Sequence, residues 1–199
     1  MNSIISRGIE MAKQAKVLTD VDAKRILAVI AQDRYAERNR ALFMVSYLAG
    51  LRACEIASLT IGSVLTSTGE VGDRITLLKS QTKGHEARSV PIARRLRKEL
   101  EAYLGTMPKL EPHRPLFTSQ KGGRFDSHGV VLLLKRIFAE AGVAGASSHS
   151  GRRTFATRLG SKGVGIRVIQ ALLGHASITT TARYVEASEH QQVAAVELL

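Results

Sequence analysis

The stretch Gly50-Leu51-Arg52-Ala53-Cys54-Glu55, residues 50–55, separates an apolar-periodic run over residues 37–49 from a shorter one over residues 55–59. Glycine directly after a periodic run is a typical helix stop, so a helix is predicted on each side of it. Arg52 follows this stop among residues that otherwise resemble core, and a charge in such a place needs a partner. Glu55 can supply one. The pair either fixes the turn as a partly buried ion pair or holds the planar guanidinium group of Arg52 ready for a phosphate.

Outside this stretch, periodic runs bounded by glycine and proline predict a mainly α fold with a small antiparallel β-sheet. Thr19 is expected to cap a first helix whose initial turn is rich in carboxylates. We expect one domain over residues 19–187, an N-terminal tail over 1–18 and a C-terminal segment over 188–199. Strands are predicted over residues 74–78 and 88–92, and further helices over 93–104, 127–141, 151–159, 166–173 and 179–185.

Residues 81–86, Gln-Thr-Lys-Gly-His-Glu, lie between the two expected strands and are polar and rich in turn formers. A hairpin is the economical interpretation. It places Lys83 on a projecting element.

The chain is strongly basic, with a formal net charge of +12 and a pI of about 10.3. Between residues 112 and 185 only Asp126 and Glu140 oppose eleven basic residues, namely Arg114, Lys121, Arg124, Lys135, Arg136, Arg152, Arg153, Arg158, Lys162, Arg167 and Arg183. A polyanion relieves such repulsion, and both DNA and a membrane surface are polyanionic. No apolar run approaches the roughly 20 residues of a membrane span and no signal peptide is evident, so we expect a cytoplasmic, DNA-binding protein.

Three further polar groups stand out, each with an ordinary alternative. His149 and Arg152 lie three residues apart at the start of an expected helix, where they suit an anion, although a solvated helix face has the same pattern. His175 follows the helix stop at Gly174, where a C-terminal capping contact is the alternative. Tyr184 comes nine residues later, and packing of a half-buried ring is its alternative.

Taken together, these positions resemble the catalytic domain of the tyrosine recombinase (phage integrase) family. The resemblance runs from about Leu18 to Tyr184. Its motifs in chain order are Gly50-Leu51-Arg52 with Glu55, Lys83-Gly84, Val90-Pro91, Leu116-Phe117, His149-x-x-Arg152 followed by Thr154-Phe155-Ala156-Thr157, Leu173-Gly174-His175, and Tyr184. The individual motifs are modest, but their joint order and spacing are specific.

The resemblance implies a DNA strand-transferase in which Tyr184 attacks the scissile phosphodiester, leaving a 3′-phosphotyrosine link and a free 5′-hydroxyl. Arg52 and Arg152 are then expected to clamp the non-bridging oxygens of the phosphorane. The bond energy is conserved for religation, so the family chemistry implies neither a metal nor a nucleotide cofactor.

Further roles are implied for the remaining positions. Lys83 resembles the general acid that protonates the departing 5′ oxygen, and His149 the acid/base that handles the tyrosine proton. His175 would orient the phosphate, and Glu55 would hold Arg52 without touching DNA.

Cys54, the single cysteine, lies in an apolar-periodic stretch and is expected to be a small buried residue rather than a nucleophile or ligand.

The chain also departs from most relatives at its N-terminal end. Most relatives carry an N-terminal DNA-clamping domain, whereas at most eighteen residues precede the catalytic domain here. It therefore resembles the short single-domain members, or is a fragment. We expect weak binding of monomers to double-stranded DNA, self-association into a tetramer on two sites, and a possible accessory DNA-bending protein. Val193, Val196 and Leu198 are candidates for docking on a neighbouring protomer, and Arg153 and Arg158 for contacting the DNA backbone.

Three alternative functions remain open from the sequence. A DNA-binding regulator would keep the fold without the reaction, and a type IB topoisomerase would relax supercoils through the same chemistry. A metal-dependent nuclease is disfavoured because His85, His113, His128 and His190 show no metal-ligand spacing.

Overall fold

The computed structural model describes residues 14–82, 86–184 and 196–197. Outside these residues lie Lys83, His85, His190 and nearly all of the segment 188–199. The elements in chain order are α1 (Asp20–Ala31), α2 (Ala36–Ala49), α3 (Ala53–Ser58), η1 (Ile61–Ser63), β1 (Arg74–Leu77), η2 (Lys79–Gln81), β2 (Arg88–Pro91), α4 (Arg94–Leu104), α5 (Ser127–Glu140), α6 (Ser150–Ser161), α7 (Ile166–Leu173) and α8 (Ile178–Ala182). The predicted fold class, mainly α with a small antiparallel sheet, is confirmed.

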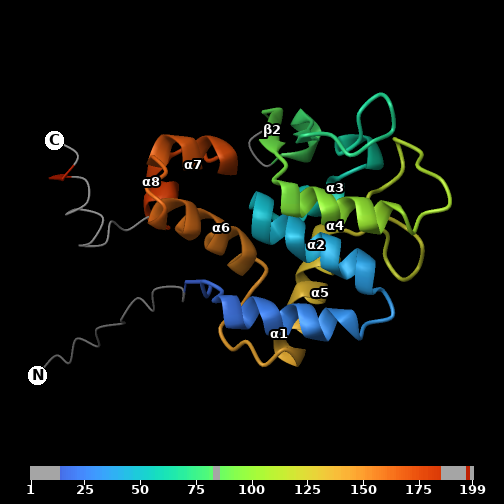
Figure 1. Ribbon diagram of the computed structural model, residues 1–199, viewed down its shortest axis with the longest axis horizontal. Helices are drawn as coiled ribbons and strands as arrows, with labels where there is room; N and C mark the ends of the chain where they lie inside the picture. Colours follow the sequence, from blue (N-terminus) through green and yellow to red (C-terminus); the bar gives the residue numbers. More distant parts are fainter. Residues whose placement is uncertain (1–13, 83–85, 185–195, 198–199) are drawn as a thin grey trace, which may run out of the picture.

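Helix α2 is the central element and packs against α1, α4 and α6 (Figure 1). Its apolar side chains Leu42, Phe43 and Met44 are completely buried, as expected for a helix surrounded by others. Phe43 stacks on Tyr47 with ring centroids 5.3 Å apart. The helix ends at Gly50, whose φ of 65° is the left-handed conformation that glycine adopts at low cost. This stop directs the chain into α3 and sets the position of Arg52.

Strands β1 and β2 form a two-stranded antiparallel sheet in which Ile75 pairs with Val90 and Leu77 with Arg88. Ile75, Leu77 and Val90 are buried. Because side chains alternate between the two faces of a strand, Arg88 lies on the same face as Val90, toward the protein interior.

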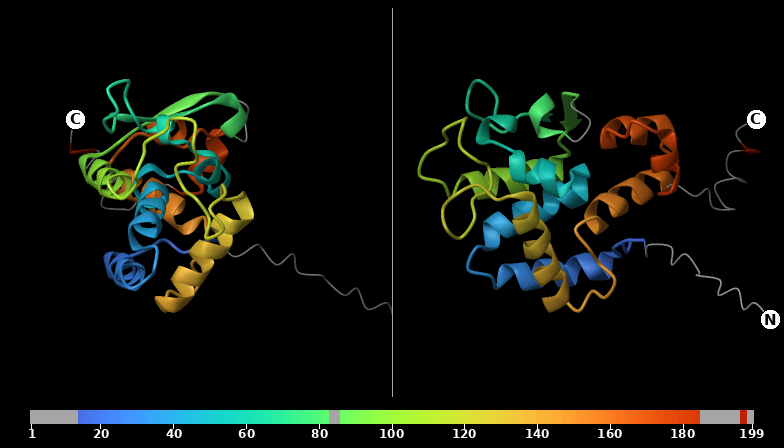
Figure 2. Two further views of the ribbon diagram at one scale, coloured as in Figure 1. Left: turned by 90° about the vertical axis from the view of Figure 1, so that its right-hand side faces the viewer. Right: turned by 180° about the vertical axis from the view of Figure 1, so that it is seen from behind.

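Helices α6, α7 and α8 gather at one end of the molecule, beside the β1–β2 sheet (Figures 1 and 2). This end has a small apolar cluster of its own, the α6–α8 cluster, which is separate from the main core. It is built on Ala156 of α6 and on Ile169 and Leu173 of α7, and Tyr184, just after α8, packs against it. Helix α6 approaches α2 closely at Gly151, where an added Cβ would overlap Ser46 Oγ. The end of the molecule that contains α6, α7 and α8 therefore has a second core, which meets the main core where α6 packs against α2.

Several local predictions can be compared with the structure directly. Thr19 caps α1 in a reciprocal capping box, with Thr19 Oγ1 accepting from Asp22 N at 3.1 Å and Thr19 N donating to Asp22 Oδ2 at 2.9 Å. The prediction that Cys54 is buried is wrong, because its side chain is exposed. In α3 the inward positions are Ala53, Glu55 and Ile56, so a carboxylate occupies the interior where the cysteine was expected. Among the described residues, no helix combines the length and apolar character needed to cross a membrane.

Candidate active site

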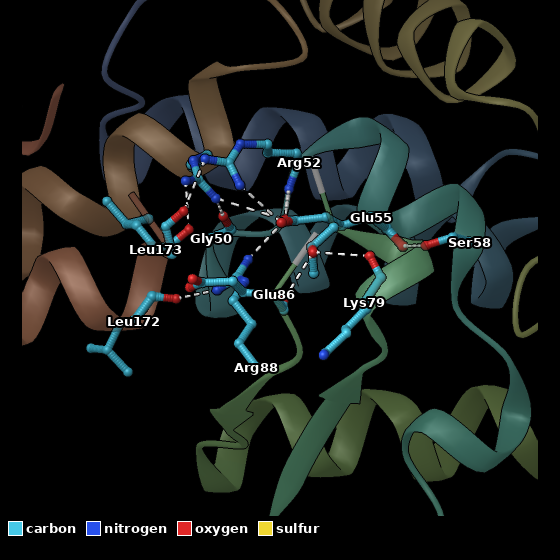
Figure 3. A network of polar contacts seen from close by, with 12 residues as sticks. Gly50, Arg52, Glu55, Ser58, Lys79, Glu86, Arg88, Leu172 and Leu173 are labelled. Carbon is cyan, nitrogen blue, oxygen red and sulfur yellow. Dashed lines mark hydrogen bonds and ion pairs between the residues drawn. The ribbon is translucent and has the colours of Figure 1, made fainter. Parts of the chain in front are cut away.

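A buried carboxylate organises the site. Glu55 is completely buried in the first turn of α3, and Figure 3 shows the polar contacts that surround it. Its Oε1 contacts Arg52 Nη1 at 2.9 Å, and its Oε2 contacts Arg88 Nη2 at 2.8 Å and Arg152 Nη1 at 3.8 Å. It also accepts the backbone N–H of Arg52 at 2.7 Å. One carboxylate thus fixes three guanidinium groups that come from the start of α3, from β2 and from α6.

The same three arginines donate to three consecutive backbone carbonyls at the C-terminal end of α7. The bonds run from Arg88 Nη1 to Leu172 O at 2.5 Å, from Arg152 Nη2 to Leu173 O at 2.7 Å and from Arg52 Nη2 to Gly174 O at 3.3 Å. A helix C-terminus carries unpaired carbonyls and about half a negative charge, so it suits cations. Arg152 also donates to Gly50 O, at the end of α2, at 2.6 Å.

The cluster has a surplus of positive charge. Three guanidinium groups face one carboxylate, and the helix end offsets only part of the difference. Burial opposes ionisation of Glu55, but Arg88 and the backbone N–H of Arg52 outweigh it and lower the pKa of Glu55 below its ordinary value. Burial, together with repulsion from Arg52, lowers the pKa of Arg152 to about 9. An incoming anion would therefore relieve both the repulsion and the incomplete charge balance.

A cleft of about 600 Å³ opens beside the cluster. Its lining includes Arg52 before α3, Thr82 and Glu86 between the two strands, Arg88 on β2, Arg167 on α7 and His175 after α7. Thr82 and Glu86 flank residues 83–85, so the predicted general acid, Lys83, follows directly in sequence after a residue of this lining. The placement of Lys83 itself lies outside the described residues.

His175 follows Gly174, which ends α7 in the left-handed conformation with a φ of 62°. Its side chain is buried, and Nδ1 is 2.8 Å from the hydroxyl oxygen of Thr181 on α8. Burial, then the positive charges of Arg152 and Arg52, lower the pKa of His175 to about 4. The imidazole is therefore neutral at pH 7 and can hydrogen-bond an anion without adding to the positive charge.

Tyr184 lies just beyond α8, half-buried against the α6–α8 cluster. Its backbone carbonyl accepts from Thr157 Oγ1 at 3.0 Å, and its ring centroid lies 6.0 Å from that of His175. It is near enough to Arg152 to contribute to the pKa of that guanidinium group. The structure thus brings four of the six predicted residues, Arg52, Arg152, His175 and Tyr184, to one place.

His149 is placed differently from Arg152. It is the N-cap residue of α6 and its side chain is exposed, whereas Arg152, one turn later, is buried among the carbonyl groups. The described lining of the cleft does not include His149. Its predicted role in proton transfer stays a prediction.

Arg88 is the residue of this site that sequence reasoning missed. Its signal was its position two residues before Val90 in an alternating strand, which places its charge on the buried face.

The two arginines expected to contact DNA, Arg153 and Arg158, both have partners in the chain. Arg153 donates to Ala15 O at 2.6 Å, while Arg158 pairs with Asp20 and stacks on the ring of Tyr47.

In the described part of the chain, no group of three histidine, cysteine, aspartate or glutamate side chains could hold a metal ion. The groups that the site does bring together are guanidinium, imidazole and phenol groups beside a buried carboxylate. Such groups suit a phosphate ester, because they supply cationic donors, a neutral hydrogen-bonding ring and a nucleophilic oxygen.

Comparison with known proteins agrees with this chemistry. Residues 16–191 match the model of the phage integrase family. The chain is 36% identical over 179 residues to "Tyrosine recombinase XerA" of Thermococcus kodakarensis, covering 88% of this chain and 60% of that protein. It is 32% identical over 158 residues to "Tyrosine recombinase XerC" of Pelobacter propionicus, covering 79% of this chain and 50% of that protein.

Solved structures agree as well. A crystal structure of XerA recombinase superposes with a TM-score of 0.72 at 27% identity, covering 93% of this chain and 66% of that one. The XerH site-specific recombinase bound to palindromic difH substrate shares the fold, with a TM-score of 0.69 at 24% identity over 96% of this chain and 54% of that one. The chain spans about half of the Pelobacter relative and three fifths of the Thermococcus relative. On the family match and the fold, it belongs to the phage integrase family of tyrosine recombinases.

Proposed function

We propose that this protein is a site-specific DNA recombinase that cuts and rejoins double-stranded DNA through a 3′-phosphotyrosine intermediate. The observation that carries the proposal is the arginine cluster around Glu55, which has a surplus of positive charge and lies beside His175 and Tyr184. A scissile phosphate carries one negative charge, and the pentacoordinate phosphorane carries a second. The cluster therefore suits the charge that develops during the reaction.

In the proposed reaction, Tyr184 Oη attacks the phosphorus atom while the bond to the 5′ oxygen breaks. The tyrosine proton leaves to a base, for which His149 is the candidate, and the 5′ oxygen takes up a proton from Lys83. Arg52 and Arg152 stabilise the non-bridging oxygens, and His175 orients them. Arg52 is the most exposed of the three arginines, and its 3.3 Å bond to Gly174 O is the longest of the three carbonyl bonds, so it can shift to a phosphate at least cost.

The biological assembly is also part of this proposal. Residues 19–187 form the catalytic domain, residues 1–18 a tail, and residues 188–199 a segment that docks on a neighbouring protomer. Two DNA sites are held by four protomers, with an accessory protein that bends DNA where the target requires it. The relative bound to difH substrate supports DNA as the partner.

The test is covalent trapping. Wild-type protein, Tyr184→Phe and a control, Tyr35→Phe, are incubated with nicked candidate-site DNA in chelator and resolved on denaturing gels. Tyr35 is also half-buried, but it lies at the N-terminal end of α2, whereas the arginine cluster lies at the C-terminal end of that helix. The proposal expects an adduct with the wild type and Tyr35→Phe and none with Tyr184→Phe. DNA binding without an adduct on any substrate would indicate a regulator, and relaxation of plasmids that lack a target site would indicate a topoisomerase.

A further inference from the structure

We propose that Arg88 is a positioning residue that fastens the C-terminal end of α7, and with it His175, to the carboxylate that holds Arg52 and Arg152. The inference deepens the function proposed above and rests on it. Arg88 itself is not assigned to the reacting phosphate. Its role is to fix the position of His175 relative to Arg52 and Arg152.

The first argument is the geometry of its guanidinium group, which joins three elements (Figure 3). The side chain of Arg88 comes from β2 and is 12% exposed. Nη2 donates to Glu55 on α3 at 2.8 Å, and Nη1 donates to the carbonyl of Leu172 on α7 at 2.5 Å. A planar, forked group can make both bonds at once, whereas the single ammonium group of a lysine cannot reproduce that fork.

The second argument is packing against the turn that carries His175. A Cβ added to Gly174 would lie 2.7 Å from Arg88 Cδ and 2.8 Å from Arg88 Nε, so the stem of Arg88 lies directly on the glycine backbone. Arg88 Nε is buried and has no hydrogen-bond partner among the described residues. The side chain therefore forgoes one hydrogen bond in a position that satisfies both Nη bonds and the contact with Gly174.

The third argument is that α7 depends on such a tether. Its buried residues Ile169 and Leu173 belong to the small α6–α8 cluster rather than to the main core. Without Arg88, the bonds from Arg152 and Arg52 would still hold the end of the helix, and the second of these is long and exposed. The position of His175 relative to Arg52 would then be set less firmly.

The test compares Arg88→Ala and Arg88→Lys with Arg74→Ala, a matched control. Arg74 is an exposed arginine of the same sheet, and its guanidinium group bonds Ser89 rather than Glu55 or α7. Two quantities are measured in the full chain: hydrogen exchange of the Gly174 and His175 amides without DNA, and the single-turnover rate of adduct formation at saturating protein. Free guanidinium is then added to Arg88→Ala, with methylammonium at equal concentration as the control.

The expected result for Arg88→Ala is at least about tenfold faster exchange at these two amides, because the helix end loses its tether. Adduct formation should slow about 100-fold with little change in DNA affinity, as expected for misplacement of reacting groups. Guanidinium should restore much of the rate and methylammonium should not. Guanidinium weakens folding, so a merely destabilised protein would get worse. Arg88→Lys should keep most of the rate defect, and Arg74→Ala should match the wild type.

Unchanged exchange in Arg88→Ala would overturn the inference, whatever the activity. So would a rate defect that disappears at saturating protein, because that would make Arg88 a DNA contact. A wild-type protein that forms no adduct would instead refute the proposed recombinase function, and the exchange data would still decide whether Arg88 fastens α7.

Discussion

Replacement of Glu55 by glutamine tests the organisation of the arginine cluster most directly. The change keeps the shape of the side chain and one acceptor oxygen but removes the only carboxylate that contacts Arg52, Arg88 and Arg152 in the described part of the chain. At an effective dielectric constant of about 20, each close pair contributes roughly 4 kcal/mol before desolvation is subtracted. Removing one partner of a buried ion pair costs about 3–5 kcal/mol.

We therefore expect Glu55→Gln to lower the free energy of unfolding by about 3–5 kcal/mol at pH 7, or the Tm by roughly 6–20 °C for a domain of this size. The pKa of Glu55 lies below its ordinary value of 4.5, so its contribution is fully present above that value. It is lost as the pH falls through the folded-state pKa. The difference between wild type and variant should accordingly shrink in acid.

The measurement is urea unfolding followed by circular dichroism at pH 7 and at successively lower pH. Glu140→Gln is the control, because Glu140 pairs with Arg136 at 3.1 Å and their side chains are 46% and 43% exposed. An exposed pair contributes only about 0–1 kcal/mol. The reasoning would be refuted if the two variants lost equal stability, or if the deficit of Glu55→Gln stayed constant in acid.

Three more results are expected, all measurable by urea unfolding. Gly151→Ala should cost about 1–3 kcal/mol because its Cβ meets Ser46, whereas Gly123→Ala, with open space around it and no helix cap to lose, should cost little; equal effects would contradict this close approach. Because the pKa of His175 is lowered to about 4, the unfolded chain binds the extra proton first, so stability should fall as the pH drops from about 6.5 to 4; His175→Gln should flatten that slope, and an unchanged slope would refute the assignment. Thr181→Val removes the hydroxyl partner of the buried imidazole and should cost about 1–3 kcal/mol, with Thr181→Ser close to wild type.

Much of the fold could be predicted because its signals are local. Gly50 and Gly174 both end helices in the left-handed conformation where periodic runs stop, and Thr19 forms the predicted capping box. The link between Arg52 and Glu55 was predictable for the same reason, since the two residues lie three positions apart. The expectation that Glu55 holds Arg52 is confirmed by their 2.9 Å contact.

What the sequence could not supply were contacts between residues distant along the chain. Arg88 meets Glu55 and Leu172 at separations of 33 and 84 residues, and no local pattern encodes either meeting. The extra partners of Glu55 were missed for this reason. Cys54 was misplaced because a six-residue helix has too few turns for its buried face to be read from periodicity.

The arginines take their places from backbone carbonyls at the end of α7, and this has an evolutionary consequence. A carbonyl group is present whatever the side chain, so substitutions at Leu172 cannot remove the acceptor that Arg88 uses. Exposed positions of α7, such as Arg167 and Val168, can therefore vary while the anchoring of the guanidinium groups is inherited unchanged. Selection for a new target or partner can act on one face of this helix while its C-terminal end continues to serve the same chemistry.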